Sequence, residues 1–222
     1  MKSFLSFIKT AEKFEDCYKV KEKIIEGAEK LFFQYGVRSV SMDDVARELS
    51  MSKKTLYQYF TNKDELVTEV ALFSIEKEKN QFDGLNEEAE NAINELFLIS
   101  ACIKETVKNM NPSLIYDLRK YHPNGWEVFQ NFKYEFIKGT VNENLKRGKA
   151  EGFYRKEIHC DVISTLRVET IQMVFDGAFA NIQDITFTDI QLQVFDHFVH
   201  GLLTEKGLKQ YQLYQKREEV KQ

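Results

Sequence analysis

Three lysines stand in the first turns of two consecutive helices predicted for the stretch SMSKKTLYQYFTNKDEL. Ser52 is the predicted N-cap of one helix and is followed by Lys53 and Lys54. Asn62 is the predicted N-cap of the next helix and is followed by Lys63. The start of a helix carries about half a positive charge, so each lysine there costs about 0.3–1 kcal/mol unless an anion lies opposite. These positions therefore suit the binding of an anion.

Short helices must position these lysines. The small residue Ala46 allows two of the helices to cross closely, and a tight turn at Ser50 and Met51 joins them. Two short helices joined in this way form a helix-turn-helix, whose second helix enters the major groove of DNA with its N-terminal residues first. Helices are expected over residues 20–35, 41–49, 53–60 and 62–82.

The side chains left exposed on the third of these helices suit duplex DNA. Lysine neutralises phosphate or reaches guanine, glutamine pairs with adenine, and the threonine methyl meets a thymine methyl. Tyrosine hydroxyls and free N–H groups at a helix N-terminus bind phosphate oxygens. For any single residue an ordinary solvated or packed surface is the alternative, but the combination favours DNA. The exposed set is Lys53, Lys54, Thr55, Gln58, Tyr57 and Tyr59.

The segment EKIIEGAEKLFFQYGVRSVSMDDVARELSMSKKTLYQYFTNKDEL resembles the DNA-binding segment of the TetR family of bacterial transcriptional regulators. The pieces LF...G, DDVA, SKKTLYQYF and NKDEL stand in the family's order and spacing. The resemblance implies that base edges or the nearby backbone are contacted by Lys53, Lys54, Thr55 and Gln58, and phosphates by Ser41, Tyr57, Tyr59 and Lys63. Ser52, at the start of the third helix, completes the predicted DNA-binding residues.

Two positions depart from the family's pattern. The family usually has glycine where this chain has Ser50, so a non-glycine residue is expected to take a left-handed turn there, at a cost of about 1–2 kcal/mol. The family often has a small residue where this chain has Lys54, and a long cation there alters base preference. These departures bear on the operator sequence and not on the fold.

The composition is that of an all-helical globular protein. Of the 222 residues, 43% are hydrophobic, only two are proline, and no long run alternates as half-buried strands do. The net charge of -4 and the pI of about 5.7 argue against a surface that coats nucleic acid everywhere. A local basic face remains, because no acid occurs between Lys53 and Lys63.

The predicted fold class is all-α, with an N-terminal three-helix helix-turn-helix domain and a larger helical ligand-binding and dimerisation domain, about nine helices in all. Residues 1–18 are an N-terminal extension, either helical or disordered. Residues 19–66 form the DNA-binding domain and residues 67–222 the larger domain. Helices are expected there over residues 87–108, 112–120, 124–149, 161–181 and 188–205, before a charged tail.

Aromatic residues are concentrated in the middle helices of the larger domain. Each one suits a hydrophobic core, but the family resemblance implies a cavity that takes a small, often apolar molecule. Arg167 and Glu169 interrupt an otherwise apolar helix as an exposed pair, as interface residues or as ligand contacts. The predicted lining of the cavity is Phe97, Tyr116, Trp126, Phe129 and Phe175.

The last two long helices are apolar over broad sides and are expected to pair with those of a second copy in a four-helix bundle. An intramolecular core is the alternative. A two-fold dimer would read a pseudo-palindromic operator with half-sites about one helical turn, ~34–36 Å, or more apart. The predicted interface residues are Val174, Ala178, Val194, Phe195, Phe198 and Leu202.

Other functional classes find little support in the sequence. Three widely spaced cysteines without a CxxC pair read as free thiols, and neither a signal peptide nor a membrane span is recognised, so the cytoplasm is the expected location. His197, His200 and the pair His159 and Cys160 lack further ligands at metal-binding spacing, so no metal or other cofactor is predicted. No set of residues typical of an enzyme occurs.

The predicted function is therefore that of a homodimeric transcriptional regulator, a repressor by family resemblance. It binds a double-stranded DNA operator and is released by a small-molecule effector of unknown identity. The alternative is a helical protein that binds a small molecule or a partner and has lost DNA regulation.

Overall fold

The computed structural model describes the backbone of residues 2–108 and 110–219 and the side chains of residues 17–108 and 110–217. Within these ranges the chain is helical and contains no strand, which confirms the predicted all-α class. The helices are α1 (Lys2–Tyr35), α2 (Met42–Glu48), α3 (Lys53–Tyr59), α4 (Lys63–Phe82), α5 (Leu85–Glu88), α6 (Ala92–Lys108), α7 (Leu114–Tyr121), α8 (Pro123–Asn131), the π-helix η1 (Phe132–Ile137), α9 (Lys138–Ala150), α10 (Cys160–Phe175), α11 (Phe187–Leu202) and α12 (Glu205–Glu219).

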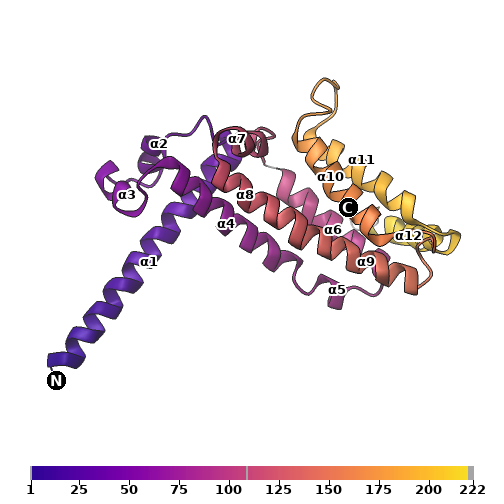
Figure 1. Cartoon of the computed structure of the whole chain (residues 1–222), viewed down its shortest axis with the longest axis horizontal. Helices are drawn as coiled ribbons and strands as arrows, with labels where there is room; N and C mark the ends of the chain where they lie inside the picture. The colour runs from indigo at the N-terminus through magenta and orange to yellow at the C-terminus, as the bar shows by residue number, and fades with distance from the viewer. Residues whose placement is uncertain (1, 109, 220–222) are drawn as a thin grey trace.

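The molecule is elongated, with α2 and α3 at one end and α10 to α12 towards the other (Figure 1). The first part of α1 projects away from the rest of the chain, so the N-terminal extension is helical in this structure (Figure 1). Helix α4 leaves the end that carries α2 and α3 and runs along α8, with which it makes one of the most extensive helix contacts of the fold. One helix thus connects the two parts of the molecule.

A single apolar cluster holds α1, α2 and α3 together and continues into the larger part. Ile24, Val45 and Leu56 are fully buried in it, because the apolar positions of these three helices face one another. Leu66 of α4 and Leu118 of α7 belong to the same cluster. The short helices therefore rest on the larger part through shared hydrophobic packing.

Polar contacts reinforce this junction. The backbone N–H of Asn111 donates to Phe33 O at 2.7 Å, and that of Arg38 donates to the buried Asp117 carboxylate at 3.0 Å. In addition, His122 Nδ1 lies 2.5 Å from Asp64 Oδ1 in the first turn of α4. The junction between the two parts is thus fixed by hydrogen bonds as well as by burial.

The helix bounds differ from expectation at a few places. The helix expected over residues 161–181 ends at Phe175, because Gly177 takes the left-handed conformation at φ 80° and terminates it. The helical run over 123–150 has the expected extent, but it contains a π-helical stretch. The described residues also form a one-turn helix, α5, and a helical tail, α12, so they contain more helices than the nine expected.

Candidate nucleic-acid interface and interior cavity

Serine hydroxyl groups begin both helices of the helix-turn-helix. Ser41 Oγ accepts from the Asp44 N–H at 3.2 Å, and the Ser41 backbone N–H donates to the Asp44 carboxylate at 2.9 Å, which completes a capping box. The Ser41 hydroxyl also donates to this carboxylate at 2.6 Å, and the two hydrogen bonds that Ser41 donates lower the pKa of Asp44. Ser52 Oγ accepts from the Thr55 N–H at 3.0 Å. In the free protein Ser41, a predicted phosphate contact, and Ser52, a predicted DNA-binding residue, therefore act as helix caps, and Thr55 is held by Ser52.

The turn between α2 and α3 depends on Ser50. Its φ of 52° is left-handed, as the comparison with the family's glycine predicted. The Ser50 N–H donates to Arg47 O and the Met51 N–H to Ala46 O, so these bonds close the end of α2. A residue with a Cβ is strained in this conformation.

Replacing Ser50 with glycine is therefore expected to stabilise the protein by about 1 kcal/mol, because glycine takes a left-handed turn without the steric cost of a Cβ. Chemical denaturation measures the free energy of unfolding. Ser50→Ala is the matched control and should give no stabilisation, because alanine keeps the Cβ. Equal stabilities of the glycine variant and the parent would show that the turn is unstrained.

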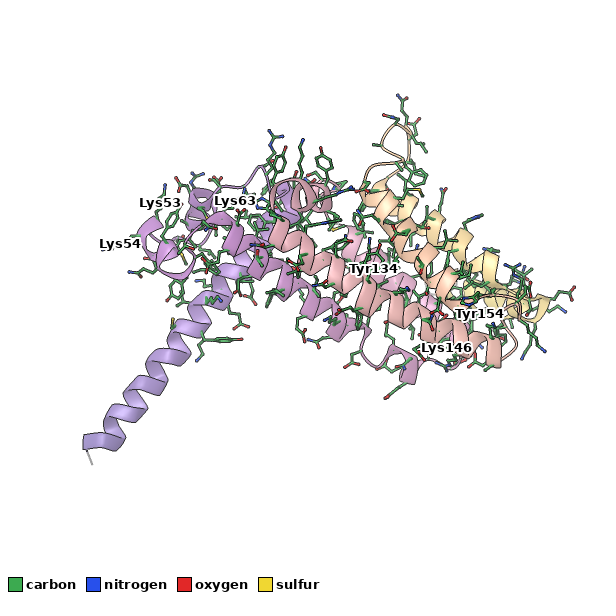
Figure 2. The ribbon with its side chains drawn as sticks, viewed as in Figure 1. Lys53, Lys54, Lys63, Tyr134, Lys146 and Tyr154 are labelled. Carbon is green, nitrogen blue, oxygen red and sulfur yellow. The ribbon has the colours of Figure 1, made fainter. Side chains whose placement is uncertain are left out.

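The outer face of α3 carries the side chains predicted to meet DNA. Lys53, Lys54 and Gln58 are exposed, Tyr57 is 41% exposed, and only Leu56 of this helix is buried. Lys53 and Lys54 lie on the outer side of the helix-turn-helix, away from the larger part of the molecule (Figure 2). The helix therefore presents its N-terminal cations outward, as insertion into a groove requires.

Lys53 has an anion opposite in the free protein. Its Nζ lies 2.8 Å from the Asp43 carboxylate of α2, and this contact raises the pKa of Lys53. Both partners are more than half exposed, so the pair is weak and phosphate can replace the carboxylate. Lys54 has no ion pair among the described residues, so its ammonium is available without a competing partner.

Lys63 and Tyr59 are less accessible than Lys53. The Lys63 ammonium donates to Val37 O at 2.6 Å at the junction, and its burial lowers its pKa. Tyr59 is half-buried beside Cys17 of α1, and burial raises the pKa of its phenol. Lys63 thus already holds two parts of the fold together, and its contact with phosphate remains a prediction.

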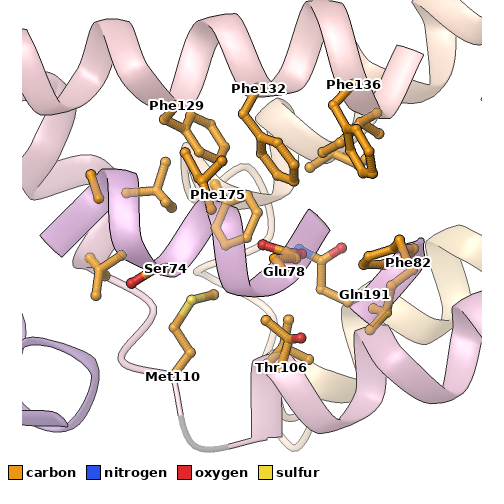
Figure 3. Close-up of a pocket in the computed structure, with 18 of the residues that line it drawn as sticks. Ser74, Glu78, Phe82, Thr106, Met110, Phe129, Phe132, Phe136, Phe175 and Gln191 are labelled. Carbon is orange, nitrogen blue, oxygen red and sulfur yellow. The ribbon is translucent and has the colours of Figure 1, made fainter. Parts of the chain in front are cut away.

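A cavity of about 190 Å³ lies beyond the helix-turn-helix. Its lining residues come from α1, from α4 and from every helix from α6 to α11, the π-helix included. This volume is more than ten times the ~10–15 Å³ that one water molecule needs. Phe132 and Phe136 of the π-helix stack at 5.4 Å and enter the cavity beside Phe129 and Phe175 (Figure 3). The cavity is therefore large enough for a small molecule and mostly apolar.

Of the predicted lining residues, Phe129 and Phe175 border the cavity, and the other three do not. Phe97 packs against the rings of Tyr211 and Tyr214 on α12. Trp126 packs against Phe129 at 5.6 Å between ring centroids and lies under the Arg119 guanidinium, but it is not part of the cavity lining. Tyr116 is 45% exposed at the surface and hydrogen-bonds to Lys120.

Polar side chains reach this apolar space from separate helices. Glu78 of α4 and Gln191 of α11 enter it between the phenylalanine rings and Met110 (Figure 3). Arg167 of α10 also lines it, and its guanidinium stacks on Phe195 at 5.0 Å. The sequence did not single out Glu78 or Gln191, since each is an ordinary polar residue in a helix.

Glu78 is expected to make stability depend on pH. Burial in the apolar cavity raises its pKa from 4.5 to about 7, so the native protein keeps a proton that the unfolded chain releases above about pH 4.5. The stabilising effect of that proton is complete below pH 4.5 and is lost as the pH rises to about 7. The loss amounts to roughly 3 kcal/mol at most.

Glu78→Gln should abolish this part of the pH dependence. The free energy of unfolding of the variant should therefore increase relative to that of the parent as the pH rises from 4.5 to 8. Denaturant titrations across that range measure the difference. Glu76→Gln, on the exposed side of the same helix, is the control and should leave the profile unchanged. Parallel profiles for parent and Glu78→Gln would contradict the assignment.

The residues predicted for a dimer interface are distributed between the core and the surface. Val174, Phe195 and Leu202 are buried within the protomer, so they are corrected to core residues. Val194 and Phe198 are partly buried, and Ala178 is exposed in the segment after α10. The large apolar side chains that α10 exposes are Val162, Leu166 and Met173.

Arg167 and Glu169 do not form the exposed pair that was one alternative. Arg167 is buried against the cavity, whereas Glu169 is exposed and accepts a hydrogen bond from Tyr134. No helix among the described residues is long and apolar enough to cross a membrane.

The fold and the exposed basic helix α3 are those of a helical protein with an N-terminal helix-turn-helix. Residues 24–70 match the family model described as bacterial regulatory proteins, tetR family. Over this segment the chain is similar to the DNA-binding region of that family.

Known proteins are similar to this chain over most of its length. The uncharacterized HTH-type transcriptional regulator YvaF of Bacillus subtilis (strain 168) is 23% identical over 189 residues, which cover 83% of this chain and 96% of that protein. A transcriptional regulator of Saccharomonospora viridis, solved in complex with choline, has a TM-score of 0.70 at 15% identity over 85% of this chain and 100% of its own. The ketosteroid transcriptional regulator KstR2 of Mycobacterium tuberculosis has a TM-score of 0.59 at 16% identity, over 83% of this chain and 95% of its own. These structural similarities support the fold.

Proposed function

We propose that this regulator is a homodimeric repressor that a small-molecule effector releases from a pseudo-palindromic operator. Residues 19–66 are the DNA-binding unit, and residues 67–222 bind the effector and the second copy. The effector site is the interior cavity, and the operator contacts come from α3 and the start of α4.

The observation that carries this proposal is the course of α4. The helix begins at Lys63 beside the helix-turn-helix, and its second half lines the cavity with Ser74, Glu78 and Phe82. A molecule that fills the cavity presses on the same rigid helix that holds α2 and α3 in place. Because each half-site requires one recognition helix, a small change in α4 alters the separation of the two helices in a dimer.

The dimer face is assigned to α10. Val162, Leu166 and Met173 follow a helical spacing along one side of this helix and are 61%, 56% and 43% exposed. Apolar side chains of this size gain stability when they are covered, and two antiparallel helices of each copy can cover one another.

Selection of genomic fragments by the purified protein tests the proposal. The expected result is a pseudo-palindrome bound by two chains, with an affinity that falls steeply with salt because phosphate contacts release counterions. Recovery of no DNA would favour a partner- or ligand-binding protein that has lost DNA regulation.

A further inference from the structure

Arg167 is a buried cation without a hydrogen-bond acceptor. Its side chain lines the cavity, the residue is 3% exposed, and its Nη1 has no hydrogen-bond partner within the described part of the chain. Its guanidinium instead lies over the rings of Phe195 and Phe198, at 5.0 and 5.5 Å. Ring faces attract the cation but offer no lone pair to its five N–H donors. Part of the hydrogen-bonding capacity of Arg167 is therefore unused inside the protein.

No carboxylate of the described side chains pairs with this cation. Glu78 is the other titratable residue in the lining, but burial is the only cause that shifts the pKa of either group, so they do not act as an ion pair. Glu169 lies outside the cavity lining and accepts from Tyr134. A counter-ion for Arg167 must therefore come from a molecule in the cavity.

The rest of the lining suits an apolar body. Phe129, Phe132, Phe136 and Phe175 border the space from α8, the π-helix and α10 (Figure 3). From there the lining continues to Val37, which belongs to the hydrophobic cluster shared with α2 and α3. A molecule held at Arg167 thus extends its apolar part towards the DNA-binding end.

We propose that the effector is an amphipathic monoanion, whose carboxylate or similar planar oxyanion pairs with Arg167 and whose apolar body packs among the phenylalanines. This inference rests on the proposed function in taking the cavity as the effector site. Arginine suits the role because its planar fork binds a carboxylate through two parallel hydrogen bonds.

The charges of the cavity favour an anion over a cation. Burial lowers the pKa of Arg167 to about 10, so this group stays charged at neutral pH. Burial raises the pKa of Glu78 to about 7, so the carboxyl group can take up a proton and become a hydrogen-bond donor. The uncompensated charge in the cavity is then positive, and an anion neutralises it.

Direct binding to the free protein, without DNA, tests the proposal with three probes of equal chain length: dodecanoate, dodecanol and dodecyltrimethylammonium below their micellar concentrations. Calorimetry should give an affinity for dodecanoate about 10- to 100-fold above that for dodecanol, which is the usual effect of a charge-assisted hydrogen bond. The ammonium compound should bind weakest. Equal affinities, a preference for the ammonium compound or no binding of dodecanoate would overturn the proposal.

Arg167→Met should remove the preference for dodecanoate while dodecanol still binds, because methionine keeps the length of the side chain and loses its donors. Arg167→Lys keeps the positive charge but lacks the planar guanidinium, so it should show a reduced preference for dodecanoate over dodecanol. This variant replaces Arg167→Met in the experiment if the methionine variant does not fold. Arg217→Met, on exposed α12, is the matched control and should behave as the parent. An unchanged preference in both Arg167 variants would exclude this residue as the anchor.

Operator binding measured with and without dodecanoate separates this inference from the proposed function. Arg167-dependent binding that leaves the DNA complex intact would overturn release by an effector but retain the anion site. Release of DNA by dodecanol and dodecanoate with equal potency would retain the proposed function and overturn the anion site.

Discussion

Replacing Lys53 and Lys54 together with alanine is expected to weaken operator binding by roughly 100-fold or more and to flatten its salt dependence. Both cations stand at the exposed N-terminus of α3, and no acid follows before Lys63. Each lysine that contacts a phosphate contributes about one unit to the slope of log affinity against log salt concentration. A dimer of the double variant lacks four lysines, so its slope should be about four units shallower. Fluorescence anisotropy at several salt concentrations measures both quantities.

Asp43 enlarges this effect. In the parent its carboxylate pairs with Lys53, whereas in the double variant it remains as an uncompensated negative charge at the DNA-facing end. Lys146→Ala with Lys209→Ala is the matched control, because both lysines are exposed outside the helix-turn-helix and the net charge changes equally. Figure 2 places Lys146 far from Lys53. If the first double variant bound the operator as tightly as this control, α3 would not be the recognition helix.

The helix-turn-helix could be predicted closely from the sequence because short-range rules determine it. Capping by Ser41 and Ser52 and the left-handed turn at Ser50 depend on residues within a few positions of one another. The sequence could not reveal that Lys53 pairs with Asp43, because such a contact depends on how two helices cross.

The cavity was predicted less well because residue type does not give the direction of a side chain. Phe129 and Trp126 are three residues apart on α8, yet the first lines the cavity and the second packs outside it. Arg167 was noticed as a charge in an apolar helix, but only the packing of α10 on its neighbours places it inside. Polar groups such as Glu78 gain significance only when apolar walls surround them.

The same limitation applied to the dimer face. Helices α10 and α11 are apolar on more than one side, and the sequence does not say which side the protomer itself covers. The packing of these helices within the protomer buries Val174 and Phe195 and leaves Leu166 exposed. The exposed set is therefore the better guide to the interface.

Replacing Leu166 with glutamate is expected to convert the dimer into a monomer and to reduce operator affinity by at least roughly 100-fold, because one recognition helix then binds one half-site alone. Leu166 is 56% exposed at the middle of the apolar side of α10, so the change places a charge in the proposed interface without opening the core. Analytical ultracentrifugation gives the mass, and anisotropy gives the affinity.

Leu72→Glu provides the control for this experiment, since Leu72 of α4 is similarly exposed, at 49%, but lies outside α10 and α11. That variant should stay dimeric and bind the operator normally. A single half-site separates the two effects further, because the Leu166 variant should bind it as well as the parent if its helix-turn-helix is intact. A dimeric Leu166→Glu protein would exclude the exposed side of α10 as the interface, whereas a monomer with full operator affinity would exclude dimerisation as the source of that affinity.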